Sequence, residues 1–324
     1  MKLAAVLLCV VFGCTACGGG GGDAGAAVEP TAPAPTTQET QCVAAGWQRL
    51  LVPAAGLQRL VLWKAPAGVW SRGAIVVFHG GGGQATNFCV ANVALIAPQV
   101  RFTEAALAQG FAVFLLDSSD RVTDQQGRLC GKVWDDEVRS RDSLDLPFVE
   151  ALLTRNIPSQ RPAGSRSEVF LTGLSSGGYM AVRAATVLAD RVTAFAPVSS
   201  GDPYGWTRDC SPRPGDRVNV FGVALDNETG RNISEPGACS AAAYANERPW
   251  PSTVAKPVWR AFHHAQDAIH DLSCVDKLTR QLRSRGYPGP AALRLEGAAR
   301  LADWHYWLDD YNQPLLDFFA AQLR

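Results

Sequence analysis

The chain has 324 residues, of which 47% are hydrophobic and 19% are charged, so it can bury one large core or two small ones. Its 30 basic and 30 acidic residues give a formal net charge of zero, without any basic tract or stripe. Nucleic acid is therefore not an expected partner.

The first residues have the pattern of an export signal. A charged residue precedes an apolar run over residues 3–12, which is too short to span a bilayer as a helix. The run ends in small residues and resembles a bacterial lipoprotein signal in which Cys17 is lipidated. Lipidation at Cys14 and a simple secretory signal cut near Ala16 stay open as alternatives. All three predict an exported protein, either secreted or held at a membrane through a lipid anchor only.

The composition divides the chain into three parts. Residues 1–17 are the predicted signal, and residues 18–41 are a predicted flexible tether rich in Gly, Ala, Pro and Thr. Residues 42–324 form one predicted domain. Within it, a segment at about 201–256 is rich in Gly, Pro, Asn and Arg, which indicates a loop-rich insertion that forms one wall of a cleft. A plain surface loop is the alternative.

Short apolar runs alternate with helical stretches along this domain. The predicted strands are residues 57–62, 74–78, 112–116, 169–172, 194–198, 258–262 and 292–295, with an edge strand at 50–52. The predicted helices lie near residues 102–109, 143–155, 177–189, 273–285 and 313–323. Because the strand runs are continuously apolar, we expect an α/β fold whose doubly wound, mostly parallel sheet is covered on both faces.

Outside the signal the chain has an even number of cysteines, which in an exported protein indicates disulfides. They are Cys42, Cys89, Cys130, Cys210, Cys239 and Cys274. We expect the pairs Cys89–Cys130, Cys210–Cys239 and Cys42–Cys274, although spacing alone does not choose among the possible pairings. A free buried cysteine is the alternative for any one of them. No cysteine or histidine cluster has the spacing of a zinc site, so no metal is expected.

A G-x-S-x-G motif surrounds Ser175, between a predicted strand and a predicted helix. This context predicts a nucleophile elbow, in which a sharp turn lifts the serine hydroxyl out of the sheet towards a base. The flanking Gly173 and Gly177 let neighbouring backbone approach closely. Only Ser175 fits, because a motif centred on Ser176 would need glycine in place of Leu174. An ordinary glycine-rich turn is the alternative.

A serine nucleophile needs a base and a group that orients the base. In an α/β fold with a nucleophile elbow, the expected order along the chain is serine, then acid, then histidine. Of the five histidines, only His305 follows the last predicted strand, so it is the expected base. Asp267 is the first carboxylate after the strand predicted at 258–262 and is the expected acid. Asp271 is the second candidate, unless it caps the following helix. Three histidines near Asp267 are predicted to be exposed loop residues, and an effect on the local electric field is the alternative: His263, His264 and His270.

A glycine-rich segment begins with His79 and directly follows the strand predicted at 74–78. It has the pattern of an oxyanion loop, whose backbone N–H groups reach developing negative charge. Gly81 and Ser176 are the predicted donors, while His79 is expected to hold the loop rather than act as the base. A nucleotide-binding loop is the weaker alternative, because the glycine and lysine pattern of such loops is missing.

Aromatic residues near these motifs are candidates for substrate contact. We assign Trp134, Tyr179 and Trp304 to substrate binding, while Tyr306 and Trp307 are further candidates. Packing in the core is the alternative for each aromatic side chain.

The chain resembles exported α/β-hydrolases of the polyhydroxybutyrate depolymerase, feruloyl esterase and acetylxylan esterase type. The matching stretches are residues 76–81, 145–149, 173–181, 262–267 and 304–305. The resemblance implies a single catalytic domain with the α/β-hydrolase fold, in which Ser175, Asp267 and His305 form a triad and no cofactor is needed. It also implies hydrolysis of an ester, either a hydroxyalkanoate polyester or oligomer or an acyl ester of plant polysaccharide.

Two departures from the family pattern bear on the substrate. His264-Ala265-Gln266 stands where the family has glycine before its acid, and Ala302-Asp303-Trp304 stands where it has glycines before its histidine. Two other functions stay open: a serine peptidase on the same fold, and a non-catalytic surface protein that binds a polymer or a glycan.

Overall fold

The computed structural model describes residues 34–124, 127–138, 142–205, 239, 248–267, 269–297 and 305–323. The predicted signal with Cys14 and Cys17, the tether as far as residue 33, Cys210, Trp304 and most of the predicted insertion lie outside these ranges. Within them, no helix combines the length and the apolar character that crossing a bilayer requires.

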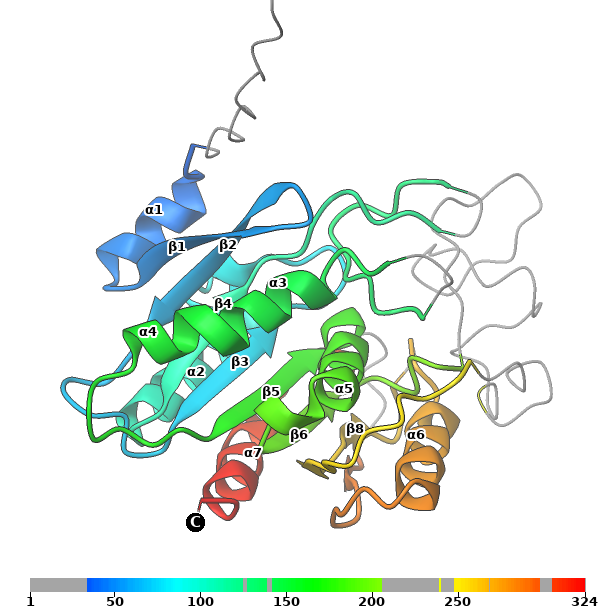
Figure 1. Ribbon diagram of the computed structural model, residues 1–324. Coiled ribbons are helices and arrows are strands. Elements are labelled where there is room, and N and C mark those ends of the chain that lie inside the picture. The colour runs from blue at the N-terminus through cyan, green and yellow to red at the C-terminus, as the bar shows by residue number, and fades with distance from the viewer. Residues whose placement is uncertain are drawn as a thin grey trace, which may run out of the picture. The chain divides into compact units, whose positions relative to one another are not determined.

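Nine strands of the described part of the chain form one sheet, drawn as arrows in Figure 1. They are β1 (Gln48–Ala54), β2 (Leu57–Lys64), β3 (Ala74–Phe78), β4 (Ala112–Leu116), β5 (Val169–Leu174), β6 (Ala194–Val198), β7 (Val258–Trp259), β8 (Phe262–His264) and β9 (Leu293–Leu295). The order across the sheet is β1-β2-β4-β3-β5-β6-β8-β9, and β7 pairs with β6. β2 is antiparallel to β1 and β4, while the remaining pairs are parallel. The predicted mostly parallel sheet is confirmed.

Helices cover both faces of this sheet. They are α1 (Thr37–Ala44), α2 (Ala97–Ala108), α3 (Leu146–Ala151), α4 (Ile157–Gln160), α5 (Ser176–Val187), α6 (Leu272–Ser284) and α7 (Asp309–Ala320), with 3₁₀ turns η1 (Ala85–Phe88), η2 (Ala94–Ile96) and η4 (Ala189–Arg191). One hydrophobic cluster packs α3, α5 and α6 on one face, and a second packs α1, α2 and α7 on the other. Figure 1 shows α3 and α5 in front of the sheet and α2 behind it.

Strand β3 shows why the strand runs are continuously apolar. All five of its residues are buried. Val76 and Phe78 belong to the cluster with α5, whereas Ile75 and Val77 belong to the cluster with α2. Because successive side chains of a strand point to opposite faces, a sheet covered on both faces needs apolar residues at every position.

The strand predicted at 258–262 consists of two short strands. β7 ends at Trp259 and β8 begins at Phe262. Both pair with β6 in one register, with Phe195 opposite Trp259 and Val198 opposite Phe262. The interruption therefore leaves unchanged the direction in which the chain enters the turn after β8.

The helix predicted near residues 143–155 begins later and extends further. α3 leads directly into a π-helical turn, Leu152–Asn156, and then into α4. The Ile157 N–H donates to the carbonyl of Leu152, five positions back, which is the π-helical pattern. The next residue, Pro158, has no N–H to donate. The last helix begins at Asp309 rather than at residue 313, with two acidic residues in its first turn, which favour a helix N-terminus.

α1 shortens the predicted tether. Its cap is Thr36, whose hydroxyl accepts a hydrogen bond from the Glu39 N–H at 3.1 Å. Cys42 on this helix is fully buried and is bonded to Cys89 beside η1. Residues 37–41 are therefore part of the folded domain and not of a flexible tether, because a cross-link that composition does not reveal anchors them.

The predicted disulfide pairing is wrong. Cys42 pairs with Cys89 at a Cα–Cα distance of 5.6 Å, and Cys239 pairs with Cys274 at 4.8 Å. Cys130 is also disulfide-bonded. Pairing requires Cα atoms within about 7 Å, and only the tertiary structure brings α1 beside η1. The pair Cys239–Cys274 also fastens one point of the predicted insertion to α6.

Candidate active site

The candidate residues gather at one edge of the sheet. His79 directly follows β3, Ser175 follows β5, Ser199 follows β6 and Asp267 lies in the turn after β8. Because these strands are parallel, their carboxyl ends lie at the same edge. Open α/β sheets bind their ligands in the crevice outside this edge.

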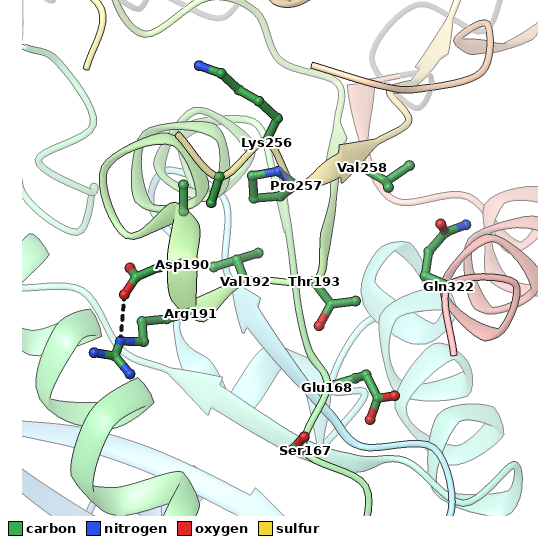
Figure 2. A pocket seen from close by; sticks show the side chains of 12 residues that line it. Ser167, Glu168, Asp190, Arg191, Val192, Thr193, Lys256, Pro257, Val258 and Gln322 are labelled. Carbon is green, nitrogen blue, oxygen red and sulfur yellow. Dashed lines mark ion pairs between the residues drawn. The ribbon is translucent and has the colours of Figure 1, made fainter. Parts of the chain in front are cut away.

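A hollow of about 630 Å³ lies at the opposite edge, and Figure 2 shows the side chains that line it. Glu168, Thr193 and Lys256, which precede β5, β6 and β7, are among them. Asp190 and Arg191 at its rim form an ion pair of 3.1 Å. Since Ser175 lies at the other ends of the same strands, this hollow is not part of the candidate site.

Ser175 occupies a strained turn between β5 and α5. Its φ of 54° and ψ of −120° lie in a region that L-residues rarely adopt, at a cost of about 1–3 kcal/mol. Its N–H donates to the Val198 carbonyl of β6 at 2.9 Å, and its carbonyl accepts from the Tyr179 N–H of α5 at 3.0 Å. Ser175 is partly exposed, whereas its neighbours Leu174 and Ser176 are buried. This is the geometry of a nucleophile elbow, as the G-x-S-x-G motif predicts.

The glycines of the motif are required by close packing. A Cβ atom on Gly173 would overlap the carbonyl of Gly177. A Cβ atom on Gly177 would overlap the carbonyl oxygens of Phe78 and His79, at the start of the predicted oxyanion loop. The elbow and that loop are therefore in direct backbone contact.

Asp267 and His305 come together across 38 positions of sequence. The two carboxylate oxygens lie 3.0 and 2.9 Å from Nδ1 of His305. Nδ1–H is thus the donor to the carboxylate, which leaves Nε2 free to receive a proton from a nucleophile. Both side chains are buried, with 7% and 5% of each residue exposed.

The surroundings of Asp267 favour its charged form. Burial alone would raise the pKa of Asp267, but the charge of His305 and its hydrogen bond, with smaller contributions from His263 and His270, outweigh burial and lower it to about 2. Oδ1 also accepts from the backbone N–H groups of Ile269 and His270 at 2.8 and 2.9 Å. Asp267 can therefore orient and stabilise a protonated His305.

Asp271, the second candidate for the acid, caps α6. Its side chain accepts from the Ser273 N–H at 2.9 Å, as its alternative interpretation predicts. The three histidines near Asp267 were predicted to be exposed, and this is wrong: His263, His264 and His270 are exposed by 0%, 1% and 4%. The turn after β8 is held inward by the hydrogen bond of His270 to Ser199, 71 positions away, and a polar local sequence does not show such a contact.

Hydrogen bonds on both sides hold the loop that begins at His79. The His79 Nδ1–H donates to the Gly80 carbonyl at 2.7 Å, and its Nε2 accepts from the Ser118 N–H at 3.0 Å. Burial lowers the pKa of His79, so the ring is neutral. With both nitrogens engaged, His79 holds the loop. The Gly82 N–H donates to the Lys132 carbonyl at 2.7 Å, which fixes the tip of the loop.

The two predicted oxyanion donors, Gly81 and Ser176, lie in the loop after β3 and at the start of α5. Gly81 is exposed, and within the described part of the chain its N–H makes no hydrogen bond. Ser176 is the first residue of α5, and the leading N–H groups of a helix have no partners within it. Backbone contact between Gly177 and His79 keeps the two segments side by side.

The side chain of Ser176 has a role that the sequence did not reveal. Its hydroxyl donates to Oδ2 of Asp136 at 2.7 Å and accepts from the Trp134 N–H at 3.1 Å. Asp136 is completely buried. A buried carboxylate thus holds the residue after the nucleophile, through a contact 40 positions away in sequence that no local motif marks.

The three aromatic residues assigned to substrate binding differ in their positions. Trp134 is fully buried, and its indole N–H donates to the His79 carbonyl at 2.8 Å, so it supports the oxyanion loop. Tyr179 is 1% exposed and packs edge-to-face on His270 at 5.4 Å. Both positions favour the packing alternative. Trp304 lies outside the described residues.

Ser175 and His305 are connected through β6. Val198 accepts from the Ser175 N–H, the next residue Ser199 accepts from Nδ1–H of His270 at 2.8 Å, and the His270 and His305 rings lie 4.8 Å apart. Within the described residues there is no hydrogen bond between the Ser175 hydroxyl and His305. Such a bond commonly tightens only when substrate is bound.

Metal ligands are not grouped at this edge. Within the described ranges, no three His, Cys, Asp or Glu side chains are arranged to hold a metal ion.

Two comparisons with known proteins give no match: no family model matches the chain, and no curated protein does. Solved structures do match. The chain is similar to Est1E from Butyrivibrio proteoclasticus, with 13% identity, 85% of this chain and 98% of that chain covered, and a TM-score of 0.50. It is also similar to a thermostable esterase, with 11% identity, 85% of this chain and 62% of that chain covered, and a TM-score of 0.50. At such identities the likeness concerns the fold, and the protein has the α/β-hydrolase fold.

Proposed function

We propose that the protein is an exported serine esterase that hydrolyses carboxylic esters through an acyl-enzyme. The observation that carries this proposal is the buried pair of Asp267 and His305 at the same sheet edge as the strained turn of Ser175. The pair supplies an oriented base, and the turn supplies a raised hydroxyl. The similar thermostable esterase supports ester hydrolysis on this fold.

The proposed reaction has two halves, acylation of Ser175 and hydrolysis of the acyl-enzyme. His305 Nε2 takes the proton of the Ser175 hydroxyl while the serine oxygen attacks the ester carbonyl. His305 then gives that proton to the departing alcohol, which leaves an acyl group on Ser175. In the second half, His305 activates a water that releases the acid and restores Ser175. Asp267 remains ionised and stabilises the imidazolium in both halves.

The N–H groups of Gly81 and Ser176 are the proposed oxyanion donors. Loss of a single such donor costs on the order of 10²–10³ in turnover in a well-studied protease. Their loop and helix are joined by the contact of Gly177 with His79 and by the hydrogen bonds of Trp134 and Ser176. This rigidity favours donors that need no rearrangement during the reaction.

The proposed substrate follows from the sequence resemblance: a hydroxyalkanoate polyester or oligomer, or an acyl ester of plant polysaccharide. Hydrolysis by the full chain and by Ser175→Ala tests both function and substrate. The panel holds p-nitrophenyl acetate and butyrate, methyl ferulate, acetylated xylan, a hydroxybutyrate oligomer and a peptide amide. We expect turnover of at least one ester, and its loss in the variant.

The other outcomes of this panel decide between the remaining functions. Strong cleavage of the peptide amide with weak ester cleavage would replace the esterase with a peptidase. A folded protein with no turnover at all would favour a polymer-binding or glycan-binding protein. Ester hydrolysis that survives Ser175→Ala would overturn the proposed mechanism.

Export and a lipid anchor at Cys17 belong to the same proposal. The two described disulfides support an oxidising compartment. Labelling of expressing cells with a radioactive fatty acid tests the anchor. We expect label on the wild-type chain and on Cys14→Ala, but none on Cys17→Ala. Label that is lost only in Cys14→Ala would move the anchor to that residue, and an unlabelled wild-type chain would leave a secreted protein.

A further inference from the structure

His270 connects the nucleophile, the acid and the base of the candidate site, although the proposed reaction does not use it. It lies in the turn after β8 and is 4% exposed. Its Nδ1–H donates to the Ser199 carbonyl at 2.8 Å, directly after β6. Its backbone N–H donates to Oδ1 of Asp267 at 2.9 Å, and its carbonyl accepts from Nε2–H of His263 at 3.1 Å.

The ring of His270 also contacts the base. It stands edge-to-face against the ring of His305, with a centroid distance of 4.8 Å and an interplanar angle of 75°. A second edge-to-face contact joins it to Tyr179 of α5 at 5.4 Å and 81°. The ring therefore fills the space between the helix that follows Ser175 and the base, and it limits rotation of His305 about the axis that joins it to Asp267.

The hydrogen bond to Ser199 fixes which nitrogen of the His270 ring carries the proton. Nδ1 carries the proton that goes to Ser199, so the ring stays neutral as long as Nε2 remains unprotonated. Burial lowers the pKa of His270, and the nearby His305 and His263 lower it further against the opposing charge of Asp267, to about 3. A neutral ring matters here, because a second cation beside His305 would oppose the imidazolium that forms during the reaction.

We propose that His270 is a positioning residue for the base: as a neutral imidazole anchored to Ser199, it fixes the Asp267 carboxylate through its backbone and the His305 ring through its own ring edge. This inference rests on the proposed function, since it concerns the same site. It differs from a purely structural role because it predicts effects on turnover and on its pH dependence, beyond any effect on folding.

Two substitutions separate the two halves of this role. His270→Phe keeps a ring against His305 but removes the donor to Ser199. His270→Asn keeps a short donor for Ser199 but removes the ring. We expect each to lower kcat by roughly 10-fold with KM changed by less than about 2-fold, and His270→Ala to lower kcat by about 100-fold.

The pH profile of kcat/KM gives the second readout. The groups that face His270 are His305, His263 and Asp267, with the Tyr179 ring on its other side. If the anchored side chain keeps the backbone N–H of His270 on Asp267 and the ring against His305, its replacement weakens stabilisation of the imidazolium, and the acid limb of the profile moves to lower pH by about half a unit or more. His264→Asn is the matched control in the same turn: His264 is also buried, and its Nδ1 accepts from the Gln266 N–H at 3.1 Å. We expect its kcat to fall less than in the His270 variants and its acid limb to stay at the wild-type pH.

Ser175→Ala, assayed beside these variants, separates the two proposals. If it stays active, the proposed function itself fails. If it is inactive while the His270 variants keep wild-type kcat and pH profile, only the role of His270 is overturned. Equal losses in His264→Asn and the His270 variants would also overturn it, because they would point to general damage to the turn.

Nitrogen NMR of the wild-type protein tests the same idea without any variant. We expect the His270 ring to remain a neutral Nδ1–H tautomer from pH 8 to pH 5. Titration of this ring within that range would overturn the proposal, even if the variants fail to fold.

Discussion

The Cα atom of Gly177 packs so closely against the backbone of His79 that no Cβ atom fits between them. Gly177 belongs to the first turn of α5, and His79 opens the loop that carries Gly81. This contact sets the separation of the two proposed oxyanion donors, Gly81 and Ser176. The position of a glycine in the motif thus controls a distance on which the proposed catalysis depends.

Gly177→Ala is expected to lower kcat on the order of 10²-fold, because the added methyl group pushes the loop away from α5 and removes one oxyanion donor from reach. Steady-state kinetics on p-nitrophenyl butyrate measure this effect. Val187→Ala, at the exposed end of the same helix, is the control and should leave kcat unchanged. Wild-type kcat in Gly177→Ala would show that the contact does not position the donors.

Ser176→Ala is expected to lower both stability and turnover. The substitution leaves the Asp136 carboxylate and the Trp134 N–H without their shared partner, which costs about 1–3 kcal/mol for buried groups. We expect the melting temperature to fall by several degrees and kcat by about 10-fold, since the backbone N–H of residue 176 remains. Calorimetry and kinetics measure the two effects, with Ser159→Ala on the exposed end of α4 as control. Unchanged stability would rule out the hydroxyl as a support.

The buried histidines predict loss of stability in mild acid. The pKa of His270 is about 3 in the folded protein and close to 6.5 in the unfolded chain, so the unfolded chain binds more protons as the pH falls below 6.5. Stability from this residue is therefore complete above pH 6.5 and falls by up to about 1.4 kcal/mol per pH unit towards pH 3. Burial lowers the pKa of His263 as well and adds in the same direction.

Urea unfolding at intervals from pH 7 to pH 4 measures this dependence. His270→Asn should give a shallower slope than the wild-type protein, by about 1 kcal/mol per pH unit. Ser284→Ala, at the exposed end of α6, is the control, because it removes no group that titrates in this range. Parallel slopes in the wild-type protein and His270→Asn would mean that His270 is already charged in the folded state.

Removal of the Cys42–Cys89 disulfide is expected to cost about 4 kcal/mol, from the loop entropy of a cross-link that spans 47 positions. For a domain of this size that corresponds to a fall in melting temperature of roughly 10 °C. The double variant Cys42→Ser and Cys89→Ser, compared by calorimetry with Val43→Ala on the exposed side of α1, gives the number. A melting temperature within about 1 °C of the control would show that α1 is held by packing alone.

Local pattern was sufficient for the sheet and for the order of its elements. The strands at 74–78, 112–116 and 194–198 have the predicted bounds, because a buried parallel strand leaves an uninterrupted apolar run. α1 escaped prediction, since eight residues of mixed polarity gain their stability from a cross-link to Cys89 rather than from their own sequence.

The candidate site was likewise predictable from the sequence only in part. The strained turn at Ser175 could be predicted because such a turn has a sequence signature. Asp267 and His305 could be assigned from their places after strands, and the structure brings them together. The inward position of His270 and the contact between Asp136 and Ser176 depend on segments 71 and 40 positions apart in sequence, so neither has a local signal. The disulfide pairs failed for the same reason.

The position of Cys42 ahead of β1 has a mechanical consequence. In the described part of the chain, β1 is an edge strand that pairs with β2 alone, so a pull on its end would open its hydrogen bonds one after another. Any load applied to the chain before Thr36 meets the covalent bond to Cys89 before it reaches Gln48. The force is thereby carried into η1, past the sheet edge. A protein held by its N-terminal segment would therefore keep β1 paired with β2 under load for as long as that bond stays oxidised.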